Sequence, residues 1–149
     1  MTAYLLDVNV LIALGWRAHP DHGRAQSWFA KNSRVGWATC PFTQAAFVRI
    51  ISNPAFSADA VLPVEALRLL TANLNHPTHQ FWADNISLWD AVRHFEGHLV
   101  GHQQITDAYL LGLAIHKKGK LATLDRSVAE LVDHGDPRAD AVELIAGKF

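Results

Sequence analysis

The sequence is poor in cysteine, in charge of one sign and in long apolar runs, and each shortage excludes a class of protein. The single cysteine, Cys40, cannot form a disulfide within the chain, which fits a reducing compartment. The formal net charge is −1, so no overall basic field attracts nucleic acid. The apolar stretches are too short to cross a bilayer, and no secretory signal is visible, so we expect a cytoplasmic protein.

What is present is enough apolar residue for a sizeable core. Half of the 149 residues are hydrophobic and only 18% are charged, which predicts one folded domain over residues 1–149 rather than a disordered chain. Short apolar runs predict strands at residues 3–6, 35–38, 80–83, 120–123 and 141–145. Helical patterns cover residues 8–14, 21–32, 42–52, 63–74, 87–95 and 105–116, and a capping box at Ser127 predicts one more short helix.

This alternation of strands and helices is typical of an α/β fold with a mainly parallel central sheet flanked by helices. In open sheets of this type, ligands bind beyond the carboxyl ends of the strands. Asp7 directly follows the first predicted strand, and Asp125 follows the strand at residues 120–123. We therefore expect these two acids to lie at the same edge of the sheet.

A third acid, Asp107, stands at the start of the most apolar helix, for which Thr106 is the predicted N-cap. The positions that share its face are Leu110, Leu111 and their equivalents one turn later, so the carboxylate begins a core-facing stripe. An acid on such a stripe is unfavourable unless its charge is compensated, for example by a cation.

Each acid also has an ordinary explanation. Asp7 can cap the helix that follows it, although Asn9 is also available for that role. Asp125 can be a simple turn residue, although Ser127 already caps the next helix. Asp107 can lean out to water at the positive end of the helix dipole. We favour a common site because all three explanations must hold at once for the acids to be unrelated.

Three clustered carboxylates raise one another's pKa, and a divalent cation relieves that repulsion. A site of oxygen ligands without cysteine or a dedicated histidine pair favours Mg²⁺, with Mn²⁺ as a plausible substitute. The matching chemistry is attack of a metal-activated water on a phosphodiester. Gln44 begins a second core-facing stripe, and its amide oxygen could ligate a metal weakly or bind a metal-bound water. The alternative is a buried glutamine whose amide is satisfied by the backbone.

Four motifs that contain these residues resemble the PIN-domain family, and within it the VapC-type ribonuclease toxins of bacterial toxin–antitoxin pairs. They occur in the family's order and span almost the whole chain: LLDVNVLI at residues 5–12, TCPFTQAAFVR at 39–49 with Asn53-Pro54 after it, QITDAYLL at 104–111, and LATLDR at 121–126. Asp-x-Asn alone would be a weak signal, whereas four motifs in order are a strong one.

The resemblance implies a PIN-like three-layer fold, Mg²⁺-dependent endoribonuclease activity on RNA, and neutralisation by a VapB-like antitoxin. It places the metal-binding acids at Asp7, Asp107 and Asp125. Gln44 is a departure, because many family members carry Glu there, and this puts a full two-metal site in doubt. The alternative reading is therefore a catalytically weak RNA- or protein-binding module. A receiver-like signalling domain fits less well, because Asp7 is not part of a pair of acids.

Two further expectations concern surfaces. The Asp107 helix is apolar almost all round, and Gly112 would allow close approach of another element, so we expect a homodimer or antitoxin contact on that helix. Trp16 lies in a predicted loop and is the tryptophan most expected to be exposed, for contact with RNA or a protein partner. The histidines at 94, 98 and 102 are not expected to bind zinc, because glycines interrupt the segment between them.

Overall fold

The computed structural model describes residues 2–145, which form one parallel five-stranded sheet with the strand order β3-β2-β1-β4-β5. The strands are β1 (Tyr4–Leu6), β2 (Trp37–Thr39), β3 (His79–Phe81), β4 (Lys120–Thr123) and β5 (Val142–Leu144). Every neighbouring pair is parallel, and the register of the central strands pairs Leu5 with Ala38 on one side and with Leu121 on the other. The expected α/β fold with a mainly parallel sheet is confirmed.

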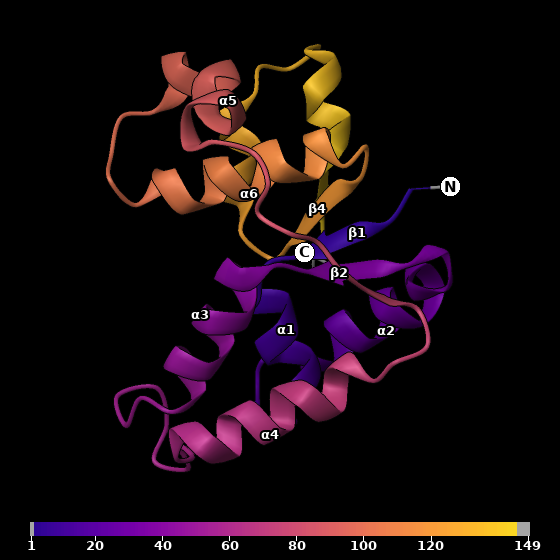
Figure 1. Ribbon diagram of the computed structural model, residues 1–149, viewed down its shortest axis with the longest axis vertical. Helices are drawn as coiled ribbons and strands as arrows, with labels where there is room; N and C mark the ends of the chain where they lie inside the picture. Colours follow the sequence, from indigo (N-terminus) through magenta and orange to yellow (C-terminus); the bar gives the residue numbers. More distant parts are fainter. Residues whose placement is uncertain (1, 146–149) are drawn as a thin grey trace.

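Helices cover both faces of the sheet, which gives three layers (Figure 1). One face carries α1 (Val8–Gly15), α2 (His22–Asn32), α3 (Pro41–Ile51) and α4 (Pro63–Leu74). The other carries α5 (Leu88–Val92) and α6 (Gln104–His116). Short 3-10 helices complete the chain: η1 (Ser33–Val35), η2 (Arg93–His98), η3 (Arg126–Leu131) and η4 (Pro137–Ala141).

The alternation of side chains along the strands divides the core into two clusters. Leu5, Ala38 and Leu121 point to the α5–α6 face, whereas the neighbouring Leu6 and Ala122 point to the face of α1 to α4. All five side chains are buried, so β1 and β4 each contribute to both clusters. The residues that directly follow β1 and β4 are therefore attached to strands that are buried on both faces.

Several predicted helix ends were wrong. α6 begins at Gln104 with Gln103 as its N-cap, so Thr106 lies inside the helix instead of capping it. Just after its other end, Lys118 adopts a left-handed backbone conformation with φ of 58°. The short helix expected after β4 is present and is of the 3-10 type, but its cap is Asp125 and not Ser127. These differences arise because competing caps lie within three residues of each other, and tertiary contacts choose between them.

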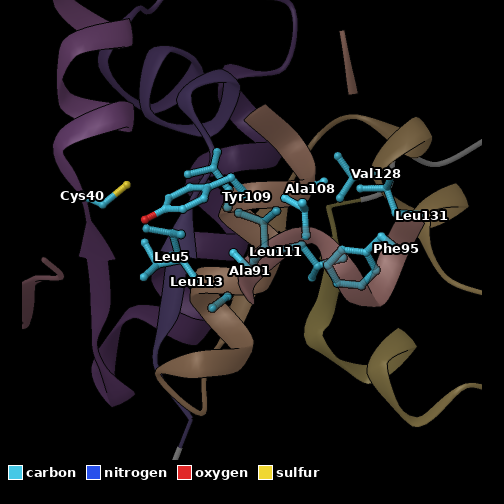
Figure 2. Packing of buried hydrophobic residues seen from close by; sticks show 14 of the residues in the cluster. Leu5, Cys40, Ala91, Phe95, Ala108, Tyr109, Leu111, Leu113, Val128 and Leu131 are labelled. Atoms are coloured by element: carbon cyan, nitrogen blue, oxygen red, sulfur yellow. The ribbon is translucent and has the colours of Figure 1, made fainter. Parts of the chain in front are cut away.

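The apolar surface of α6 is covered within the chain. Residues 108–114 are all buried, and α5 packs on them so closely that Gly112 lies against the backbone of Ala91. Figure 2 shows the resulting cluster, in which Leu111 and Ala108 of α6 lie near Phe95 of η2. The expectation that this helix forms a homodimer or antitoxin contact was wrong about the surface, because α5 and η2 already occupy it.

Trp16 is also less exposed than expected, since its ring packs edge-on against Phe56 with 5.5 Å between ring centroids. The exposed tryptophan is Trp89 on α5, with 59% of its surface accessible. No helix among residues 2–145 is long and apolar enough to cross a membrane.

Candidate functional site: an acidic edge of the sheet

Asp7 follows β1 directly and is held at the carboxyl edge of the sheet. Its backbone N–H donates to the carbonyl of Ala122 at 2.9 Å, which continues the pairing of β1 with β4. Its carboxylate also caps α1, because Oδ1 accepts the N–H of Val8 at 2.8 Å. The sequence allowed either Asp7 or Asn9 to cap α1, and the structure shows that Asp7 is the cap. Capping one helix uses only one of its carboxylate oxygens.

The second oxygen of Asp7 is bound by Thr123, the last residue of β4. The buried hydroxyl of Thr123 donates to Asp7 Oδ2 at 2.8 Å and accepts the N–H of Asp125 at 3.1 Å. Asn9 closes the network, because its amide nitrogen lies 3.3 Å from Thr123 Oγ1 and its amide oxygen accepts the N–H of Leu124 at 3.2 Å. The loop after β1 and the loop after β4 are thus tied together by side chains.

These contacts only partly offset the burial of Asp7, which is 4% exposed. Burial raises the pKa of its carboxyl, and the charge of Asp125 raises it further, whereas hydrogen bonds from Thr123 and Val8 act in the opposite direction. A buried carboxylate whose pKa is raised overall is one that a nearby cation would stabilise.

Asp107 faces the same acidic edge from the first turn of α6. The side chain is half-buried, and no hydrogen bond or ion pair to its carboxylate is found among residues 2–145. Burial, then the charge of Asp7, then that of Asp125 raise the pKa of Asp107 to about 6. The structure therefore brings the three acids close enough to repel one another, as the sequence predicted. The resulting rise in pKa is largest for Asp107.

Asp125 is exposed at this edge and is engaged with its own turn. Its Oδ1 accepts the N–H of Ser127 at 2.9 Å and the Ser127 hydroxyl at 2.8 Å, which starts η3. Within residues 2–145, no three histidine, cysteine, aspartate or glutamate side chains are arranged closely enough to enclose a metal ion. The protein therefore offers two inward-facing carboxylates and a third that would have to turn toward them.

Gln44 lies one turn into α3, beside the same edge. It is half-buried, and the stripe that enters the core contains its neighbour Thr43 together with Phe47 and Ile51. Its amide nitrogen donates to the hydroxyl of Thr39 at 3.0 Å. The alternative of a glutamine satisfied by the backbone was therefore wrong, because its amide donates to a side chain.

Comparison with known proteins identifies the family of this chain. The sequence profile described as PIN domain matches residues 4–133. The chain belongs to the PIN-domain family. Among curated proteins of Mycobacterium tuberculosis, it is 43% identical to Ribonuclease VapC38 over 127 residues, covering 85% of this chain and 88% of the relative. It is 41% identical to Ribonuclease VapC39 over 135 residues, covering 91% of this chain and 96% of the relative.

A solved structure shares the PIN fold. The crystal structure of VapBC2 from Rickettsia felis, bound to a DNA fragment from their promoter, aligns with a TM-score of 0.56. The alignment covers 83% of this chain and 88% of the other, at 13% sequence identity. This likeness supports the three-layer architecture and carries no information about individual residues.

Thr123 and Asn9 belong to this site, although the sequence did not assign them a role in it. Thr123 is simply the last residue of a predicted strand, and Asn9 was a candidate helix cap, yet both organise the carboxylate of Asp7. The available signals were the short spacings Asp7-x-Asn9 and Thr123-x-Asp125, which place a second polar side chain next to each acid. Nothing in the sequence pointed to Thr39 and His79, because the contact between them spans two strands.

Proposed function

We propose that this PIN domain is a Mg²⁺-dependent endoribonuclease that hydrolyses RNA phosphodiester bonds, and that it is the toxin of a VapBC-type pair. The relatives' names support a ribonuclease of the VapC type. The observation that carries the metal-dependent part is that Asp107, half-buried, faces the carboxylates of Asp7 and Asp125 at one edge of the sheet, which raises its pKa to about 6. Such a concentration of negative charge is suited to a divalent cation.

The residues present fit that cation. Asp7 and Asp107 would hold it, and Asp125 would complete the oxygen set directly or through water. Carboxylate oxygens favour Mg²⁺, with Mn²⁺ as a substitute, over zinc. When bound, a divalent cation lowers the pKa of a coordinated water and stabilises negative charge on the phosphate.

The protein's own residues then perform distinct tasks. Thr123 and Val8 fix the orientation of the Asp7 carboxylate by donating to its two oxygens at 2.8 Å each. Asp107 must lose its proton before it can bind a cation, so its pKa of about 6 in the metal-free protein predicts that cation affinity rises with pH through that value. Gln44 would act as a neutral group at the same edge, where it adds no charge.

The first test is cleavage of total RNA by the purified, antitoxin-free protein in Mg²⁺, in Mn²⁺ and in EDTA. We expect discrete fragments with either metal and none with EDTA. Asp7→Asn should abolish cleavage, whereas Asp90→Asn, which changes an exposed acid at the start of α5, should cleave as the wild type does. Calorimetric titration of Mg²⁺ into the same proteins gives a second readout that needs no RNA.

Two results would contradict the proposal. Cleavage by Asp7→Asn at the wild-type rate would show that Asp7 is not part of the active site. Intact RNA under every condition would favour the alternative of a catalytically weak binding module. In the second case Gln44→Glu tests whether a missing carboxylate is the reason, because it restores the residue that many family members carry.

The proposed partner is a VapB-like antitoxin, supported by the names of the relatives and by the VapBC neighbour. Addition of purified cognate antitoxin should suppress cleavage at a defined molar ratio. Sedimentation of the chain alone tests the expected homodimer, which would have to use a surface other than the buried face of α6.

A further inference from the structure

A second chain of hydrogen bonds runs from the acidic edge into the sheet, through Thr39, His79 and Gln44. Thr39 is the last residue of β2, and its side chain is fully buried at 0% exposure. Its hydroxyl lies 3.0 Å from the amide nitrogen of Gln44 and 2.8 Å from Nε2 of His79 on β3. The three side chains come from α3, β2 and β3, so only the folded chain brings them together.

The hydroxyl of Thr39 has one hydrogen to donate, and the state of His79 decides where it goes. The Leu74 carbonyl also contacts the His79 ring, and a carbonyl can only accept a hydrogen. Because Nε2 faces Thr39, we assign the Leu74 contact to Nδ1, which then carries the proton. Burial and the neighbouring His76 lower the pKa of His79, so the ring is neutral at pH 7 and above, and its Nε2 is an acceptor.

An acceptor at Nε2 takes the only hydrogen of the Thr39 hydroxyl, and the hydroxyl oxygen can then only accept. Gln44 must therefore turn its NH₂ group toward Thr39, because its carbonyl oxygen would meet a second acceptor there. If Nε2 carried the proton instead, the Thr39 hydrogen would be free, and either end of the amide could face it. The tautomer of His79 thus determines the orientation of Gln44.

We propose that Thr39 and His79 are positioning residues that lock the amide of Gln44, with its NH₂ group bound to Thr39 and its carbonyl oxygen free of that contact. Gln44 then offers an uncharged acceptor, which suits a water molecule, a ribose hydroxyl or a cation, and it does not offer a donor to phosphate. The lock itself is a property of the metal-free protein, and only its effect on cleavage rests on the proposed function.

The lock is tested by NMR on the full chain with ¹⁵N-labelled histidine, near pH 7.5 and without metal or RNA. Long-range ¹H–¹⁵N correlations report which ring nitrogen carries the proton, and His79→Gln identifies the His79 signal among the nine histidines. We expect the proton on Nδ1 of His79, whereas the exposed His102 gives the ordinary tautomer mixture as a reference in the same spectrum. A His79 ring protonated mainly on Nε2 would overturn the proposal.

Variants of Thr39 separate positioning from packing. Thr39→Ser keeps the hydroxyl and should keep slow hydrogen exchange of the Gln44 NH₂ group, whereas Thr39→Val keeps the shape, removes the hydroxyl and should speed that exchange. His79 should keep its Nδ1–H form in both variants, because the Leu74 carbonyl holds that proton. Unchanged exchange of the Gln44 NH₂ group in Thr39→Val would show that Thr39 does not take part. If Thr39→Val fails to fold, the wild-type and Thr39→Ser spectra still decide the question.

A double-mutant cycle tests the consequence for cleavage. Thr39→Val should lower the cleavage rate by about 3- to 10-fold, the value of one hydrogen bond, and Thr39→Ser should restore it. In a Gln44→Ala background, Thr39→Val should change the rate no further, because Thr39 acts only through Gln44. Additive losses would overturn the positioning role. If the proposed function is wrong, the result is different: the wild-type protein does not cleave RNA, although the proton of His79 is found on Nδ1 as expected.

Discussion

Asp107→Asn should stabilise the protein when metal is absent, although it removes an acid from the start of a helix. The pKa of Asp107 lies at about 6, whereas its ordinary value is 3.8. At about 1.4 kcal/mol per pH unit, this difference corresponds to about 3 kcal/mol of unfavourable charge in the folded state above pH 6. The side chain is half-exposed, and water screens its charge, so we take about 1.5 kcal/mol.

The helix dipole acts in the opposite direction. An acid in the first turn of α6 is stabilised by about 0.5 kcal/mol, and asparagine loses that contribution. The net expectation is that Asp107→Asn raises the free energy of unfolding by about 1 kcal/mol at pH 7.5 in EDTA. For a chain of this length, that equals a rise in Tm of about 3 °C.

The pH dependence has a definite sign. Because the folded-state pKa is higher than the unfolded one, the folded protein binds more protons between pH 3.8 and about 6, and its stability falls as pH rises through that window. The advantage of Asp107→Asn should therefore be absent near pH 4 and complete above pH 7. Urea unfolding of both proteins from pH 4 to pH 8, in EDTA, measures the difference directly.

Asp90→Asn is the matched control, because Asp90 lies in the first turn of α5 and is exposed. It should lose a few tenths of a kcal/mol at pH 7.5, with no gain at any pH. If Asp107→Asn is instead less stable than the wild type at pH 7.5 in EDTA, the carboxylate is not a burden in the metal-free protein, and the reasoning fails.

Three more expectations follow from the packing and from the acidic edge. Gly112→Ala should destabilise the protein by about 3 kcal/mol, because the added Cβ would overlap the backbone of Ala91. The control Gly97→Ala, whose added Cβ has no atom within 4 Å, should change the stability by less than about 1 kcal/mol. Urea unfolding of the two variants measures the difference. Thr123→Val should cost about 2–3 kcal/mol in the same assay, since Asp7 loses a 2.8 Å hydrogen bond, and an unchanged midpoint would contradict the network. Saturating Mg²⁺ should raise the Tm of the wild type by several degrees and leave that of Asp7→Asn unchanged in differential scanning calorimetry.

Much of the architecture could be predicted from local patterns. The helix Pro63–Leu74 and the strand Lys120–Thr123 have the predicted bounds, because an apolar period and clear end signals coincide there. The placement of Asp7 and Asp125 at one edge followed from the parallel sheet alone, since parallel strands end at a common edge. The family followed from four short motifs in order.

Other features required contacts between segments far apart in the chain. The excess apolar surface of α6 suggested a partner, but α5 and η2 of the same chain cover it, and no local pattern predicts which element packs on a given face. The caps at Asp7 and Asp125 were decided by pairing between β1 and β4.

The sequence by itself determined the order of strands and helices and the identity of the three acids, because hydrophobic period and strand ends are local properties. The tertiary structure alone decided how those acids are held and how strongly they repel one another. Thr123 meets Asp7 across 116 positions, and Thr39 meets His79 across 40. Hydrogen-bond partners and raised pKa values depend on distance and burial in space, and only the folded chain sets both.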